Sequence, residues 1–129
     1  MATDLLTAFN EACELWNAAN YDKLAERFDA DIIMKKLDDA GSIVGIGNAL
    51  VYLNANQLLK HPKLEQIKAE KPLTWASDTI GQVSGTAQYK DKTKPADGKI
   101  TPVRFTFTFT RANDTEEWLI ANAFQARLQ

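Results

Sequence analysis

The segment from Arg104 to Arg111, with the sequence RFTFTFTR, alternates phenylalanine and threonine without a break. Side chains on a β-strand point alternately to opposite faces of the sheet, so this pattern predicts a strand with one aromatic and one hydroxyl-bearing face. An aromatic face of this kind is stable only when another layer of apolar side chains covers it. We therefore expect Phe105, Phe107 and Phe109 to face the helices of the same chain.

The first half of the chain has the apolar periodicity of helices. Leu5, Phe9, Cys13 and Trp16 recur at helical spacing, and the run NALVYLNANQLLK places apolar side chains near one face of a later helix. His61 and Pro62 follow that run and are expected to close it, with the histidine capping the last carbonyls rather than acting in catalysis. Helices are predicted over residues 4–19, 21–28 and 48–60.

The second half of the chain has the period of two that is typical of strands. The segment DADIIMKKL predicts an earlier strand over residues 29–37, and the glycines of GSIVGIG predict a turn. The segments KDKTKPADGK and RANDTEE are expected to be exposed, mobile connections. Helices first and strands last indicate an α+β fold, and 129 residues suit one domain, residues 1–129. The later strands are predicted over residues 74–79, 82–89, 102–110 and 117–128.

The composition argues against several classes of function. A net charge of -2 gives no basic patch for nucleic acid, and one cysteine with one histidine supplies too few donors for a zinc or iron–sulfur site. Cys13 has no partner for an internal disulfide, which favours a reducing cytoplasm. The chain starts without a basic, apolar signal segment and contains no apolar run long enough for a membrane span. We expect no metal, cofactor, nucleic acid or membrane partner.

Three segments carry a resemblance to a known family. In order along the chain, NAANYDKLAERFDADIIM, GIGNALVYL and EWLIANAFQ resemble motifs of the nuclear transport factor 2-like superfamily, which includes ketosteroid isomerase, SnoaL-type polyketide cyclases and scytalone dehydratase. The resemblance covers nearly the whole chain. It implies a cystatin-like cone, in which N-terminal helices pack in the concave face of a curved, mainly antiparallel sheet around a pocket. It implies no particular reaction, because this fold hosts enzymes and non-catalytic modules alike.

The catalytic acids of ketosteroid isomerase are not found at the matching positions of this chain. The resemblance places its base near Lys36 and its oxyanion donor near Phe105, and neither is a carboxylic acid. Asp38 and Asp39 fit a turn, and Arg104 and Arg111 are expected at the surface rather than in a catalytic relay. Lys35 or Lys36 could supply a pocket amine, but adjacent residues of a strand face opposite sides, so at least one is solvated and a structural role is the simpler interpretation.

A pocket for a small hydrophobic ligand is the first functional hypothesis. In WLIANAF, Asn122 shares its strand parity with Trp118 and Phe124, which predicts a buried amide as the main polar contact. Whether such a pocket also performs cofactor-free lyase, isomerase or cyclase chemistry stays open. The predicted lining consists of Trp16, Phe28, Met34, Phe105, Phe107, Phe109, Trp118, Asn122 and Phe124.

The opposite face of the sheet suggests an alternative, a non-enzymatic association module. Threonine, glutamine and alanine dominate this face, with Arg104 as its single charge, whereas a solvated sheet normally carries lysine and glutamate. Related cone-fold proteins pair through this face, which favours a two-fold homodimer. The predicted interface consists of Thr86, Gln88, Thr106, Thr108, Leu119, Ala121 and Ala123.

Overall fold

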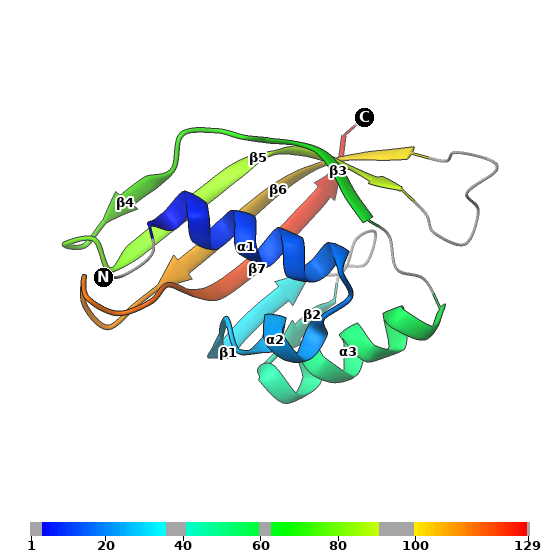
Figure 1. The fold of residues 1–129 in the computed structure, drawn as a ribbon, viewed down its shortest axis with the longest axis horizontal. Helices are drawn as coiled ribbons and strands as arrows, with labels where there is room; N and C mark the ends of the chain where they lie inside the picture. Colours follow the sequence, from blue (N-terminus) through cyan, green and yellow to red (C-terminus); the bar gives the residue numbers. More distant parts are fainter. Residues whose placement is uncertain (1–3, 36–40, 60–62, 91–99, 129) are drawn as a thin grey trace.

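The computed structural model describes residues 4–35, 41–59, 63–90 and 100–128. Two helices precede the first strand, a third follows the second strand, and five further strands complete the chain (Figure 1). The elements are α1 (Leu5–Asn17), α2 (Tyr21–Ala25), β1 (Phe28–Lys35), β2 (Ser42–Val44), α3 (Ile46–Leu59), β3 (Lys63–Ala69), β4 (Leu73–Trp75), β5 (Ile80–Lys90), β6 (Ile100–Thr110) and β7 (Leu119–Arg127).

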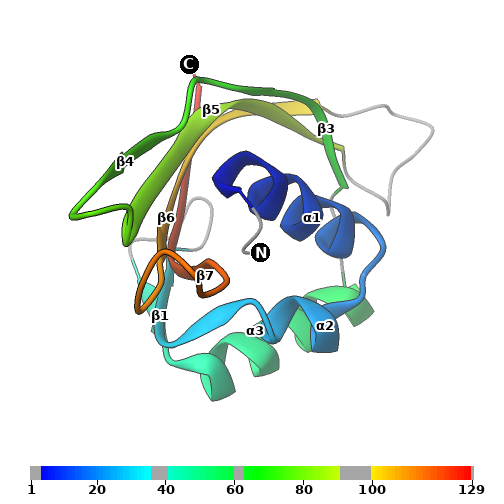
Figure 2. The same ribbon diagram turned by 60° about the vertical axis from the view of Figure 1, so that its left-hand side comes forward.

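The strands of the described chain form one sheet with the order β2-β1-β7-β6-β5-β3, and β4 also pairs with β5. The β1–β7 pair is parallel, and the other pairs are antiparallel. Figure 2 shows the sheet curving around α1, while α3 lies beside α2 and β1. No helix of the described chain covers the convex side, which we call the outer face. The predicted α+β cone is therefore confirmed as the fold class.

Helix α1 fills the concave side of the sheet. It begins where the Asp4 carboxylate accepts a hydrogen bond from the backbone N–H of Thr7 at 2.9 Å, a bond that lowers the pKa of Asp4. Its buried stripe is Leu5, Ala8, Phe9, Ala12 and Cys13. The ring of Phe9 stacks on Phe105 with centroids 5.1 Å apart and lies 5.6 Å from Phe107. These contacts place the aromatic face of β6 against the helix, as its alternation predicts.

Several element boundaries differ from the sequence prediction. Helix α2 ends at Ala25, and Phe28 already belongs to β1. The strand predicted over residues 74–79 is wrong for most of its length, because Ala76, Ser77 and Asp78 all adopt left-handed backbone angles in a turn. Strands β2 and β3 were not predicted. His61 and the segment 91–99 lie outside the described residues.

Strand β3 contains an irregularity that explains why its sequence lacks alternation. The register with β5 shifts between Glu65 and Lys68, and Gln66 has a φ of 52°. A Cβ atom on Gly85 of β5 would lie 2.1 Å from the carbonyl oxygen of Lys68, so only glycine allows the two backbones to approach this closely. The bulge therefore depends on a glycine in the neighbouring strand.

Candidate binding cavity and outer face

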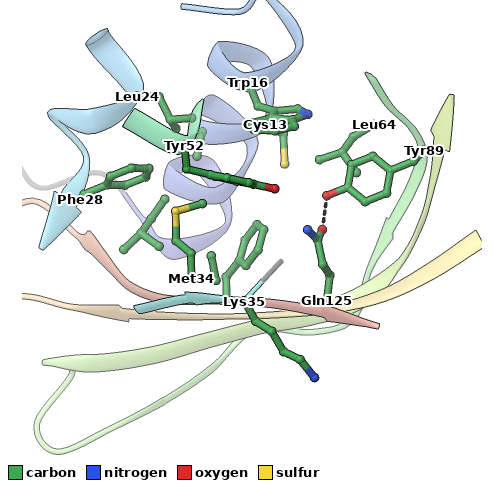
Figure 3. A pocket seen from close by; sticks show the side chains of 14 residues that line it. Cys13, Trp16, Leu24, Phe28, Met34, Lys35, Tyr52, Leu64, Tyr89 and Gln125 are labelled. Carbon is green, nitrogen blue, oxygen red and sulfur yellow. Dashed lines mark hydrogen bonds between the residues drawn. The ribbon is translucent and has the colours of Figure 1, made fainter. Parts of the chain in front are cut away.

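A cavity of about 70 Å³ lies between the helices and the concave face of the sheet. Its walls come from α1, α2, α3 and five strands (Figure 3). The lining residues are Ala12, Cys13, Trp16, Leu24, Phe28, Met34, Lys35, Tyr52, Leu64, Tyr89, Phe107, Ile120, Ala123 and Gln125. Apolar side chains dominate this lining, as is usual for small-molecule sites.

The predicted pocket residues divide into three groups. Trp16, Phe28, Met34 and Phe107 line the cavity. A second group is buried in the core beside the cavity without lining it, and consists of Phe105, Phe109 and Trp118. The third group, Asn122 and Phe124, lies on the outer face of the sheet.

The predicted inward orientation of Asn122 and Phe124 is wrong because strand β7 contains a β-bulge. Ile120 pairs with Phe109, but Asn122 pairs with Thr108, so Ala121 is an extra residue in β7. One extra residue reverses the face of every later side chain in the strand. Asn122 and Phe124 consequently share the threonine face of β6, and Phe124 is 38% exposed. Ala123, predicted at the interface, instead lines the cavity.

The same bulge brings Gln125 into the cavity, whereas uninterrupted alternation from Trp118 would place it on the outer face. The hydroxyl of Tyr89 on β5 donates a hydrogen bond to the side-chain carbonyl of Gln125 on β7 (Figure 3). Burial, and to a lesser degree the neighbouring Tyr52, raises the pKa of Tyr89 far above its usual range, so this phenol is neutral at physiological pH. The register shift is the signal that sequence reasoning missed.

The polar side chains at the cavity are uncharged or directed away. Burial raises the pKa of the Cys13 thiol to about 12, so the thiolate needed for a nucleophile does not form near neutral pH. Lys35 contributes to the rim, but Figure 3 shows its ammonium group pointing away from the cavity. Among the described lining residues there is no carboxylate or histidine. Lys36, Asp38 and Asp39 lie outside the described residues.

The outer face combines a polar centre with apolar ends. Cross-strand pairing aligns one row across six strands, and the partners in such a row share a face. The ends of this row are exposed, with Leu73 57% and Val44 54% accessible. On β5 and β6, Ser84 and Thr106 form a hydroxyl pair at 3.3 Å. The row is Leu73, Gln82, Thr108, Asn122, Ile33 and Val44.

The remaining predicted interface residues lie as follows. Thr86 pairs with Arg104, which belongs to the outer face and forms an ion pair with Glu70 at 2.6 Å. Gln88 pairs with Pro102, and Leu119 pairs with Thr110. Neither Arg104 nor Arg111 lines the cavity. The guanidinium group of Arg111 lies 3.9 Å from the centroid of the Trp118 ring.

In the described part of the chain, none of the helices has the length and apolar character needed to cross a membrane.

The chain resembles known proteins in its structure but not in its sequence. No protein-family model and no curated protein sequence matches the chain. A ketosteroid isomerase-like protein from Erwinia carotovora atroseptica superposes with a TM-score of 0.78 at 12% identity, covering 97% of this chain and 94% of that one. A protein of unknown function from Shewanella oneidensis, described as NTF-2 like, has a TM-score of 0.72 at 13% identity and covers 95% of both chains.

A third similar structure is described as a candidate calcium/calmodulin-dependent protein kinase II association domain. It comes from Xanthomonas campestris and has a TM-score of 0.69 at 20% identity, covering 93% of this chain and 82% of that one. At such identities the likeness concerns the fold. The chain therefore has the nuclear transport factor 2-like fold, and the resemblance predicted from its motifs is confirmed at that level.

Proposed function

We propose that this protein binds a small hydrophobic molecule in the cavity between α1, α3 and the sheet. The observation that supports this function is the combination of an apolar lining with a partly buried Tyr89–Gln125 hydrogen bond inside it. A cavity that served only as packing would be filled by side chains, since empty space in a core costs stability. Here Ala12 and Ala123 leave room where larger residues would close it.

Binding, rather than a defined reaction, is the part of this function that the described residues support best. The neutral Cys13 thiol and Tyr89 phenol offer neither a base nor a nucleophile at neutral pH. Lyase, isomerase or cyclase chemistry on the bound molecule is an extension of the proposal. It would require a group from residues other than the described lining. The single, buried cysteine suits the reducing cytoplasm that we propose as its location.

A thermal shift screen against steroids, terpenoids, aromatic ketones and fatty acids tests the binding function. A ligand raises the free energy of unfolding by RT ln(1 + [L]/Kd), so any hit should stabilise the parent protein. Ala123→Leu should remove the shift by filling the cavity, whereas Ala126→Leu, on the exposed side of the same strand, should keep it. A complete lack of hits, or equal shifts in both variants, would contradict binding in this cavity.

The outer face supports a second candidate function, association with a second copy of the chain. Leu73, Trp75 and Phe124 are large apolar residues exposed on this face, around a centre of small uncharged side chains. Exposed aromatic side chains and a centre without charged residues are typical of association surfaces. A two-fold dimer would bring each patch against its own copy. The association domain described for the Xanthomonas protein is consistent with such a role for this fold.

Light scattering coupled to size exclusion tests this association. We expect a dimer at tens of micromolar for the parent, and a monomer for Asn122→Arg, which places a charge in the centre of the outer face. Asn10→Arg is the matched control, because Asn10 is exposed on α1, and this helix lies on the concave side of the sheet, opposite the outer face (Figure 2). A monomeric parent, or a dimer that tolerates Asn122→Arg, would contradict the proposal.

A further inference from the structure

The cavity has an apolar end and a polar end. Leu24, Phe28 and Met34 gather on one side, while the hydroxyl groups of Tyr52 and Tyr89 and the amide of Gln125 lie toward the other (Figure 3). Burial and Tyr52 both raise the pKa of Tyr89, which is consistent with the closeness of the two phenols. A ligand that fills this space would therefore place its polar atom beside Gln125.

The hydrogen bonds at the polar end leave unused donors. The carbonyl oxygen of Gln125 accepts from Tyr89, so the two amide hydrogens on its nitrogen remain, and no described residue accepts a hydrogen bond from them. Figure 3 shows this nitrogen on the side of the amide that faces Tyr52. If the amide were turned over, its nitrogen would donate to the Tyr89 oxygen and the Tyr89 hydroxyl would become the free donor. Either arrangement presents a donor, which an acceptor on the ligand would satisfy.

The electrostatic character of the cavity favours a neutral ligand. A carboxylate transferred into an apolar site needs a cation to offset its lost hydration. The rim residue Lys35 directs its ammonium group away from the cavity, and Cys13 remains a protonated thiol. A carbonyl oxygen accepts a hydrogen bond from an amide N–H without carrying a charge. A ketone, aldehyde or ester group matches the site better than an acid.

The volume of the cavity limits the size of the ligand. An engineered cavity of about 150 Å³ holds one benzene molecule, and sites for drug-sized ligands span roughly 300 to 1,000 Å³. The cavity here measures about 70 Å³, and an adjoining one of about 10 Å³ shares Cys13, Leu64, Phe107 and Gln125. The space is smaller than the cavity that holds benzene, so a single six-membered ring is the upper limit and requires the lining side chains to move outward, whereas four fused rings would require the core to open.

We infer that the ligand is a neutral molecule of single-ring size whose carbonyl oxygen accepts a hydrogen bond from Gln125. This inference rests on the proposed binding function and specifies its ligand class. The bulge at Ala121 is required for this contact, because it directs the amide of Gln125 into the cavity instead of to the outer face. Gln125 is thus the specificity-determining residue of the site.

Cyclohexanone and methylenecyclohexane provide a matched pair of probes, because they share one shape and differ in the carbonyl oxygen. Titrations followed by ¹H–¹⁵N NMR measure both affinities for the parent and for Gln125→Met, which keeps the side-chain length and removes the amide. A hydrogen bond of ordinary strength predicts that Gln125→Met weakens cyclohexanone roughly three- to tenfold. Binding of methylenecyclohexane should not weaken.

Two further variants guard against indirect effects. Gln125→Glu keeps an acceptor for Tyr89 and removes the N–H donors, so at pH 8 it should also weaken cyclohexanone selectively. Gln82→Met, on the outer face of β5, should leave both affinities at parent values. Selective weakening in both Gln125 variants supports the inference.

Three outcomes would overturn the inference, and they differ in what they say about binding. Equal responses of the two probes to the Gln125 variants would reject the carbonyl contact while leaving the binding function intact. Tighter binding of androst-4-ene-3,17-dione or of cyclohexanecarboxylate than of cyclohexanone would reject the size or charge assignment alone. Failure of every probe to shift resonances of the lining residues would reject the binding function together with the inference.

Discussion

The side chain of Asn17, at the end of helix α1, forms two hydrogen bonds with the backbone of Leu64 in the edge strand β3. Its amide nitrogen donates to the Leu64 carbonyl at 2.9 Å, and its carbonyl accepts from the Leu64 N–H at 2.8 Å. The asparagine therefore pairs with the strand as another strand would. Because Leu64 lines the cavity, this contact fixes one cavity wall to the helix that forms another.

Replacing Asn17 by alanine should lower the free energy of unfolding by about 2 kcal/mol, since two partly buried backbone groups lose their partner. Urea unfolding followed by circular dichroism measures this change. Asn10→Ala is the matched control, because Asn10 is exposed on the same helix, and it should change stability by less than about 0.5 kcal/mol. Similar values for both variants would mean that the Asn17 contact does not hold β3.

The buried thiol of Cys13 predicts a loss of stability at high pH. Below about pH 9, the ordinary pKa of the thiol, Cys13 is protonated in both the folded and the unfolded chain. Burial raises the folded pKa to about 12, so above pH 9 only the unfolded state ionises and the free energy of unfolding falls. The slope should approach about 1.4 kcal/mol per pH unit.

Urea unfolding at intervals between pH 8 and 10 measures this dependence. Cys13→Ala should flatten the curve between pH 9 and 10, where Tyr89, whose ordinary pKa is 10.0, contributes less. An unchanged slope in Cys13→Ala would assign the loss of stability to other groups.

The phenylalanines of β6 should differ in their contribution to stability. Phe105 is buried against Phe9, so Phe105→Ala should cost roughly 3 to 5 kcal/mol. Phe107 borders the cavity and is only half-buried, so Phe107→Ala should cost less and enlarge the site. Urea unfolding checks the order, and NMR titration with 2-acetonaphthone checks whether a two-ring ketone then binds. Equal costs without new binding would contradict the placement of Phe107.

The turn between β4 and β5 should gain stability from glycine. Ala76, Ser77 and Asp78 have φ angles of 57°, 55° and 61°, which disfavour residues that carry a Cβ atom. The turn is held by a hydrogen bond from Arg111 Nε to the Asp78 carbonyl at 2.7 Å. Ser77→Gly should therefore raise the free energy of unfolding by about 1 kcal/mol.

Ser42→Gly is the matched control for this change, because Ser42 lies in the extended strand β2, where glycine should destabilise. Thermal unfolding of both variants measures the two signs. A destabilising Ser77→Gly would indicate that the backbone of the turn is not left-handed at this position.

The sequence predicted those parts of the fold in which the apolar pattern is regular. The stripe of α1 and the alternation of β6 are examples, because each directs one regular apolar face toward the core. Strand β3 was missed because the bulge at Gln66 interrupts the alternation of KLEQIKA. The face of Gln125 was missed for a related reason. Ala121 and Ala123 are both small and are tolerated on either face of a sheet, so neither indicates where an extra residue lies.

The bulge in β7 predicts opposite tolerance to charge at two adjacent positions. Ala123 lines the cavity and Phe124 is exposed on the outer face, whereas a regular strand would exchange their orientations. Ala123→Lys should therefore cost more than about 2 kcal/mol, because an ammonium group would enter an apolar site without a partner. Phe124→Lys should lower the free energy of unfolding by about 1 kcal/mol or less, since the Phe124 ring is already partly exposed and its loss removes little buried apolar area.

Urea unfolding of the two lysine variants, at protein concentrations where light scattering finds monomers, separates this effect from association through the outer face. The order of the two costs depends only on which side chain points inward, so it directly reports the register of β7. A larger cost for Phe124→Lys would mean that β7 alternates without interruption. Asn122 would then face the cavity, and Gln125 would be excluded from it.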